Sequence, residues 1–194
     1  MTQISNRRKA VAAYAAAGFV VVKPPVIRYW DSNHRSDLHI LEGADCPQKG
    51  VKSYATVGLS EHPLIRNGKE FNARVELLGA CGSEFSEFAE ILSTVGFCVI
   101  NSQWFCAPGV IFPGVLDLHG ASKTMSDIYF ADPFLWGDRF KSSIIENQMT
   151  AWLLVIPISK RETEFAVQNG PDKLEQLFER QNIDIYNLNR PSVV

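Results

Sequence analysis

Apolar residues at helical spacing predict four helices in this chain. The first covers Ile4 to Ala17 and ends at Gly18, because glycine is favoured directly after a helix. Residues Ser159 to Glu162 form a capping box that opens the third helix, and Pro171 opens the fourth. The second helix precedes Gly96, which we expect to end it. Its apolar residues lie at helical spacing and are Phe85, Phe88, Ile91, Leu92 and Val95.

Short runs rich in β-branched and aromatic residues predict strands between these helices. They cover residues 20–22, 26–30, 38–41, 54–59, 74–78, 97–105, 127–131, 150–158 and 183–188. Residues 150–158 are almost all apolar, which is typical of a strand buried on both faces. Strands and helices do not alternate regularly. The pattern therefore predicts a single α+β domain over residues 1–194, with a mixed, largely antiparallel sheet and flanking helices.

The charge of the chain argues against one class of function, nucleic-acid binding. The formal net charge is -2, and no long run of basic residues offers the surface that a nucleic-acid binder needs. The one basic cluster, Arg7 to Lys9, is interpreted as the solvated first turn of the first helix. We therefore expect no nucleic-acid partner.

The apolar run Ala10 to Val22 raises the alternative of a signal peptide, because basic residues precede it. Lys23 and two prolines follow it in place of a small-x-small cleavage site, which argues against export. The run is also too short to span a bilayer, which needs about 20 residues. Four cysteines without a CxxC pair are expected to be free thiols, with disulfides as the alternative for an exported protein. We expect a cytoplasmic protein without a membrane partner.

Two groups of residues invite a catalytic or metal-binding interpretation. In Gly58 to His62 a serine, Ser60, lies two residues from a histidine, but Pro63 follows and the second glycine of a nucleophile elbow is missing. Ser60 is interpreted as a turn residue, and Gly58 is expected to have a positive φ. The ligand types His34, His39 and Cys46 fall close together, yet their spacing fits no zinc pattern. We predict no catalytic residue, no metal site and no cofactor.

Several segments follow one another in a recognisable order. They are Tyr54 to Ser60 (YATVGLS), Arg74 to Leu78, Trp152 to Ser159 with Glu162, Phe165, Gly170 and Leu174, and the tail Asn189 to Ser192. Together they resemble the suppressor-of-fused family, from about residue 30 to the C-terminus. The resemblance implies a non-enzymatic protein-binding module. Eukaryotic members sequester a transcription factor, and bacterial members resemble immunity proteins that neutralise polymorphic toxins. The chain lacks the long insertion and the C-terminal extension of the animal form, so the bacterial role is favoured.

The partner surface is predicted from the residues and not from the resemblance. Aromatic residues in or near loops rich in proline and glycine are typical of interface anchors, and Trp104, Phe134 and Trp136 are the candidates. A role in the core is the alternative for each. The runner-up function is a small hydrolase that uses Ser60 and a histidine.

Overall fold

The computed structural model describes residues 4–194, which form ten strands, four α-helices and two 3₁₀ helices. The helices are α1 (Asn6–Phe19), η1 (Leu59–Glu61), α2 (Phe88–Ser102), η2 (Phe134–Phe140), α3 (Lys160–Asn169) and α4 (Pro171–Gln181). The strands are β1 (Val26–Trp30), β2 (Asp37–Ala44), β3 (Val51–Val57), β4 (Ile65–Arg66), β5 (Lys69–Glu70), β6 (Arg74–Gly82), β7 (Ile111–Phe112), β8 (Asp127–Ala131), β9 (Ser143–Ile145) and β10 (Gln148–Ile158).

Eight strands form one sheet in the order β1-β2-β3-β6-β10-β8-β7, with β9 paired to β10. Strand β10 runs parallel to β6, and the other pairs of this sheet are antiparallel. The predicted α+β class with a mixed, largely antiparallel sheet is confirmed. Strand β10 lies between β6 and β8 and is buried from Trp152 to Ile158, as its apolar run predicts.

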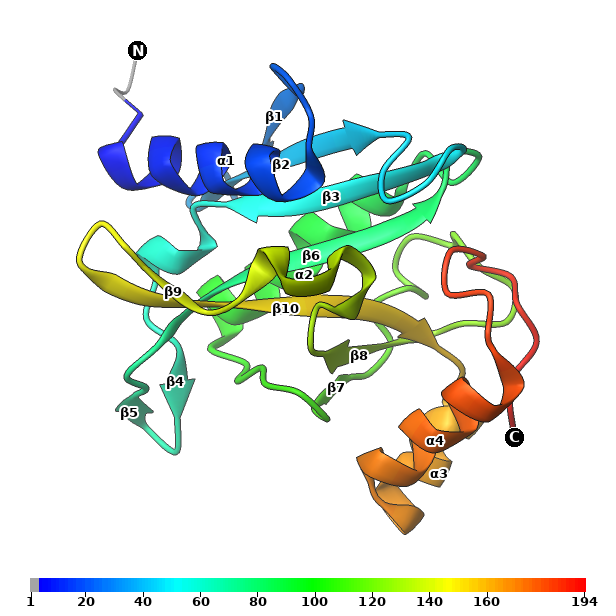
Figure 1. The fold of residues 1–194 in the computed structure, drawn as a ribbon. Coiled ribbons are helices and arrows are strands. Elements are labelled where there is room, and N and C mark those ends of the chain that lie inside the picture. The colour runs from blue at the N-terminus through cyan, green and yellow to red at the C-terminus, as the bar shows by residue number, and fades with distance from the viewer. Residues whose placement is uncertain (1–3) are drawn as a thin grey trace.

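Helices cover both faces of this sheet (Figure 1). Helix α2 lies on one face, over a core that includes Phe88, Leu92 and Leu77. The other face carries α1, η2 and the α3–α4 pair, whose core includes Phe19 and Phe140. Alternate side chains of a strand point to opposite faces, so the apolar strands supply both cores at once.

Helix α1 is confirmed, with Ser5 as its N-cap. Its predicted end is wrong, because the helix continues through Gly18 to Phe19 and closes at Val20, whose φ is 60°. A Cβ atom at Gly18 would overlap the ring of Phe140. Gly18 therefore allows close packing against Phe140 and does not end the helix. Residues 20–22 form no strand.

The predicted end of the second helix is also wrong. Helix α2 starts at Phe88 and passes through Gly96 to Ser102, so the predicted strand over 97–105 does not form. A Cβ atom at Gly96 would lie 2.5 Å from Leu38 Cδ2 on β2. Gly96 lets the helix lie close to the sheet, and packing offsets the roughly 1 kcal/mol lower helix propensity of glycine.

The C-terminal helices follow the prediction. Ser159 and Glu162 form the capping box of α3, and Pro171 opens α4. The predicted strand over 183–188 is wrong, because this segment consists mainly of turns. The backbone N–H of Gly82 donates to the carbonyl of Tyr186 at 2.8 Å. Just after this segment, the guanidinium of Arg190 donates to both carboxylate oxygens of buried Glu162 at 2.6 and 3.0 Å and holds the tail.

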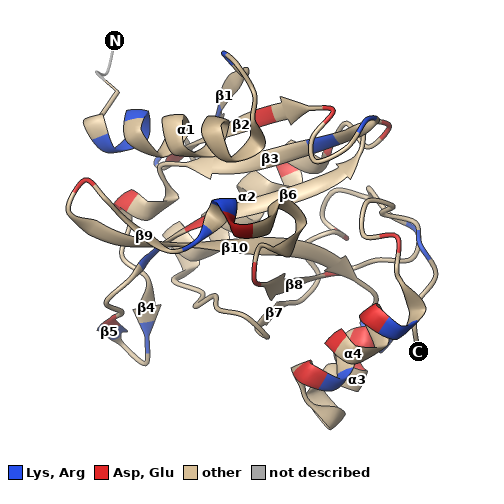
Figure 2. Cartoon of the chain, viewed as in Figure 1, with Lys and Arg blue, Asp and Glu red and all other residues tan. Residues whose placement is uncertain are grey.

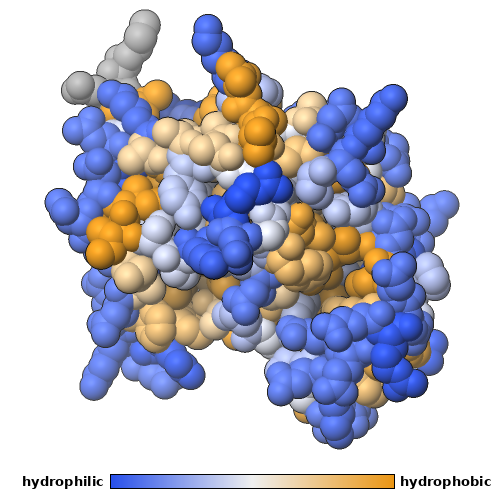
Figure 3. All heavy atoms as spheres, in the orientation of Figure 1, coloured by the Kyte–Doolittle hydropathy of each residue, from blue (hydrophilic) through white to orange (hydrophobic). Residues whose placement is uncertain are grey.

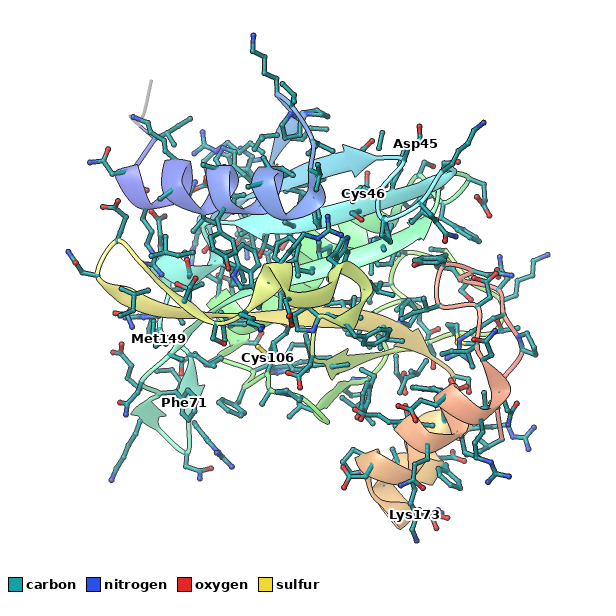
Figure 4. The ribbon with its side chains drawn as sticks, viewed as in Figure 1. Asp45, Cys46, Phe71, Cys106, Met149 and Lys173 are labelled. Carbon is teal, nitrogen blue, oxygen red and sulfur yellow. The ribbon has the colours of Figure 1, made fainter. Side chains whose placement is uncertain are left out.

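No helix within residues 4–194 has the length and apolar character needed to cross a membrane. All four cysteines in this part of the chain are free. Cys46 and Cys106, labelled in Figure 4, belong to the cores on opposite faces of the sheet. Gly58 has a φ of 112°, which confirms its predicted positive value.

Candidate functional site

The segment Gly58 to His62, the strongest catalytic candidate, surrounds a buried carboxylate. Glu76 on β6 is fully buried, and its Oε1 accepts from the backbone N–H groups of Gly58 (3.1 Å) and Ser60 (3.0 Å) and from Ser60 Oγ (2.6 Å). Its Oε2 accepts from Thr56 Oγ1 at 2.5 Å. We call these four residues the Glu76 network. It ties β3 and η1 to the neighbouring strand β6.

Arg7 extends the Glu76 network to helix α1. Its Nε donates to Ser60 Oγ at 3.1 Å, and its two Nη atoms donate to the carbonyl of Ile145 (2.6 Å) and to Thr150 Oγ1 (2.8 Å). Next to it, Arg8 pairs with Asp37 at 2.6 Å. The interpretation of this basic cluster as a solvated turn is therefore wrong for Arg7 and Arg8. These residues join α1 to the sheet.

The hydrolase alternative requires a histidine beside Ser60 and access for a substrate. Ser60 is 2% exposed, and its Oγ is bonded to Glu76 and Arg7. No histidine is among its hydrogen-bond partners in the described chain. Burial lowers the pKa of His62 and raises that of Glu76. The arrangement supports a structural role for Ser60.

The three residues considered as metal ligands have separate partners. The ring of His34 stacks on Trp30, His39 Nδ1 lies 3.1 Å from Arg8 Nη1, and the Cys46 thiol donates to the carbonyl of Phe19. Across residues 4–194 no group of three His, Cys, Asp or Glu side chains is placed to hold a metal ion.

The predicted interface aromatics differ in exposure. Phe134, the first residue of η2, is 60% exposed, and Trp104, just after α2, is 38% exposed. Trp136 is only 1% exposed, and its Nε1 donates to Ser53 Oγ at 3.0 Å. Trp136 is therefore a core residue, and the prediction that it contacts a partner is corrected. Trp104 packs on Phe112 on the α2 face of the sheet, whereas η2 covers the other face.

Phe134 lines two surface hollows. The larger, of about 370 Å³, lies between β8 and α4, and the smaller, of about 280 Å³, lies beneath η2. Asp132 and Phe134 line both. Figure 3 shows apolar residues between hydrophilic ones on this face, in the region between η2 and α4. An exposed aromatic ring beside concave, partly apolar surface is typical of a contact site for another molecule.

The larger hollow has an apolar base and an acidic rim, and we call it the acidic hollow. The base includes Tyr129, Ile156 and Phe178. Its carboxylates are those of Asp132, Asp172, Glu175 and Glu179. No Lys, Arg or His is among the described residues that line it.

Sequence patterns did not reveal two of these features. In the sequence, the acidic residues of α4 fall on the polar side of an amphipathic helix. Glu76 is one polar position within a strand. A signal for Glu76 existed, because a lone carboxylate in an apolar strand needs donors nearby, and the sequence offers Thr56 and Ser60 in the segment before it.

Comparison with known proteins finds a matching family model and a relative of this chain. The family model described as Suppressor of fused protein (SUFU) matches residues 34–191. The chain is 39% identical over 189 residues to the immunity protein YqcF of Bacillus subtilis (strain 168), covering 97% of this chain and 98% of that protein.

Solved structures share the fold at low sequence identity. A suppressor-of-fused homologue from Neisseria gonorrhoeae FA 1090 superposes with a TM-score of 0.72 and 15% identity, covering 97% of each chain. The Drosophila Suppressor of Fused gives 0.66 and 12%, covering 96% of this chain and 51% of that one. The sequence match extends over most of the chain, and the fold agrees with it. The chain therefore belongs to the suppressor-of-fused family.

Proposed function

We propose that this chain is an immunity protein, which binds a protein toxin and neutralises it without catalysing a reaction. The observation that carries the proposal is the 39% identity to the immunity protein of Bacillus subtilis over nearly the full length of both chains. The whole of residues 1–194 acts as one domain in this proposal. Helix α1 lies before the matched residues 34–191, yet Arg7 and Arg8 join it to the same sheet.

The toxin contacts the surface around Phe134 in this proposal. Its ring is exposed between two hollows, and aromatic residues beside concave surface are frequent anchors of protein interfaces. Trp104 is a second proposed contact because it is also exposed. It lies on the α2 face of the sheet, opposite to Phe134. Ser60 is buried and its hydroxyl is hydrogen-bonded to Arg7 and Glu76. This supports binding over catalysis, because a substrate would have to displace both side chains.

Co-expression tests this function directly. A candidate toxin domain, sought in the neighbouring reading frame, is expressed in a bacterial host with and without this chain. We expect growth arrest by the toxin alone, rescue by this chain, and a stoichiometric complex on gel filtration. Rescue without a complex, or no rescue by well-expressed folded protein, would refute direct neutralisation of that toxin.

A further inference from the structure

The acidic hollow is a local concentration of negative charge. Four carboxylates line it, whereas the formal net charge of all 194 residues is only -2. Figure 2 shows acidic positions on α3 and α4, with basic ones between them. No basic residue of the described chain lines the hollow, although the guanidinium carbon of Arg190 lies 5.3 Å from the centroid of the Phe178 ring. Lys173 of α4 points away from the sheet in Figure 4, and Arg190 is paired with Glu162.

One carboxylate of the hollow is fixed in place from beneath. Tyr129 on β8 is fully buried, and its hydroxyl donates to Glu175 Oε1 at 2.6 Å. Within residues 4–194, Glu175 Oε2 has no hydrogen-bond partner. An oriented carboxylate with a free oxygen is ready to accept a hydrogen bond from a cation, and such charge-assisted bonds are about twice as strong as neutral ones.

The base of the hollow selects among cations. A metal ion needs several oxygen ligands gathered at one point, and no such group occurs in the described chain. The four carboxylates instead surround the aromatic and aliphatic surface of Phe134, Phe178 and Ile156. Lysine and arginine match this arrangement, because each has an apolar stem and a charged head, and the head is attracted to aromatic faces.

We propose that the acidic hollow receives a lysine or arginine side chain of the toxin, with its stem against Phe134 and its charged head at Glu175 and Glu179. This inference rests on the proposed function and names the chemistry of the contact. A volume of about 370 Å³ lies within the range of pockets that take small ligands, so one long side chain fits. The toxin surface that docks here is accordingly basic.

Matched charge variants test the contact. Glu175→Gln with Glu179→Gln removes two charges from the hollow, and a glutamine at 175 still offers an oxygen to Tyr129. The control, Glu84→Gln with Glu87→Gln, removes two exposed carboxylates before α2, away from the hollow. Calorimetry with the toxin domain from the neighbouring frame should show at least tenfold weaker binding for the hollow variant and less than twofold change for the control.

Salt separates a local contact from the general attraction of an acidic protein. Raising the salt concentration should weaken wild-type binding more than binding of the hollow variant, because the variant lacks the charges that salt screens. Equal losses in the hollow and control variants would overturn the proposal, as would tight binding by the hollow variant.

A second measurement does not depend on the toxin. The peptide acetyl-Gly-Arg-Gly-amide is titrated into labelled protein and followed by amide chemical shifts, with the citrulline peptide as a neutral match. Saturable shifts around Gly109, Asp132 and Glu175, seen with arginine only and lost in the hollow variant, support the proposal. Shifts with both peptides or with neither overturn it. If the toxin does not bind at all, the proposed function fails, while this titration still decides the chemistry of the hollow.

Discussion

The Glu76 network and the acidic hollow both place carboxylates beside hydroxyl groups, but they use them in opposite ways. Both oxygens of Glu76 accept hydrogen bonds from the chain itself, and the side chain is fully buried. In the hollow, Glu175 uses one oxygen for Tyr129 and leaves the other free. Carboxylates saturated by their own chain hold a fold together. Those with free oxygens at a concave surface are available to a partner.

The largest expected effect is the loss of stability on removal of Glu76. Glu76→Ala leaves the donors of Thr56, Gly58 and Ser60 unpaired in the core, and each such group costs about 1–3 kcal/mol. We expect the free energy of unfolding in urea to fall by about 3 kcal/mol or more. The exposed Glu179→Ala should change it by about 0.5 kcal/mol or less. Similar losses in the two variants would contradict the comparison.

Removal of the Phe134 ring should affect binding and leave stability intact. Phe134→Ala is expected to weaken toxin binding by about 2 kcal/mol, roughly thirtyfold, because anchor residues dominate interface energies. Phe71, labelled in Figure 4, is a partly exposed phenylalanine beside the β4–β5 hairpin and supplies the matched control. Phe71→Ala should bind normally. Normal binding by Phe134→Ala, with circular dichroism confirming its fold, would show that the interface lies elsewhere.

Measuring stability over a range of pH tests how burial affects the carboxyl group of Glu76. Burial raises the pKa of Glu76 above its ordinary value, so the folded state binds its proton more tightly than the unfolded state does. Its contribution to stability is therefore fully present below the unfolded pKa, near 4.5, and is lost as pH rises towards the folded value.

This contribution is isolated by Glu76→Gln, which cannot titrate. The unfolding free energy of the wild type minus that of Glu76→Gln should fall with rising pH above about 4.5, by at most about 1.4 kcal/mol per pH unit. A difference that rises with pH would mean that the surrounding donors stabilise the ionised carboxylate more than burial penalises it.

The smallest expected effect is that of Ser60→Ala. It removes one donor to Glu76 and one acceptor from Arg7, and we expect a loss of about 1 kcal/mol in unfolding free energy. Toxin binding should stay within twofold. Turnover of an ester or phosphoester panel that disappears in this variant would instead identify the closed site as an active site.

Local patterns predicted the elements whose signals are local. The capping box at Ser159, the proline at 171 and the apolar run of β10 each act within a few residues, and each was confirmed. The two predictions that a glycine ends a helix failed for one reason. Gly18 and Gly96 are needed because Phe140 and Leu38, distant in sequence, lie against their helices. A sequence pattern contains no information on such neighbours.

The site was only partly predictable for the same reason. Phe134, in the connection between β8 and β9, is exposed as predicted. Trp136, two residues later, is buried at a break in η2, where Trp136 and Gly137 have non-helical φ and ψ. The acidic hollow joins residues of β8, η2 and α4. Its charge becomes visible only when these elements are assembled.

The position of β10 also constrains how the protein is made. Strand β10 is near the end of the chain, yet it pairs with β6 on one side and β8 on the other. A nascent chain that ends before residue 148 must leave both partner strands with open edges, which are prone to pair with other chains. The sheet can therefore close only after β10 has been synthesised. Under the proposed function, only chains that extend past β10 would have the complete sheet with which to bind a toxin.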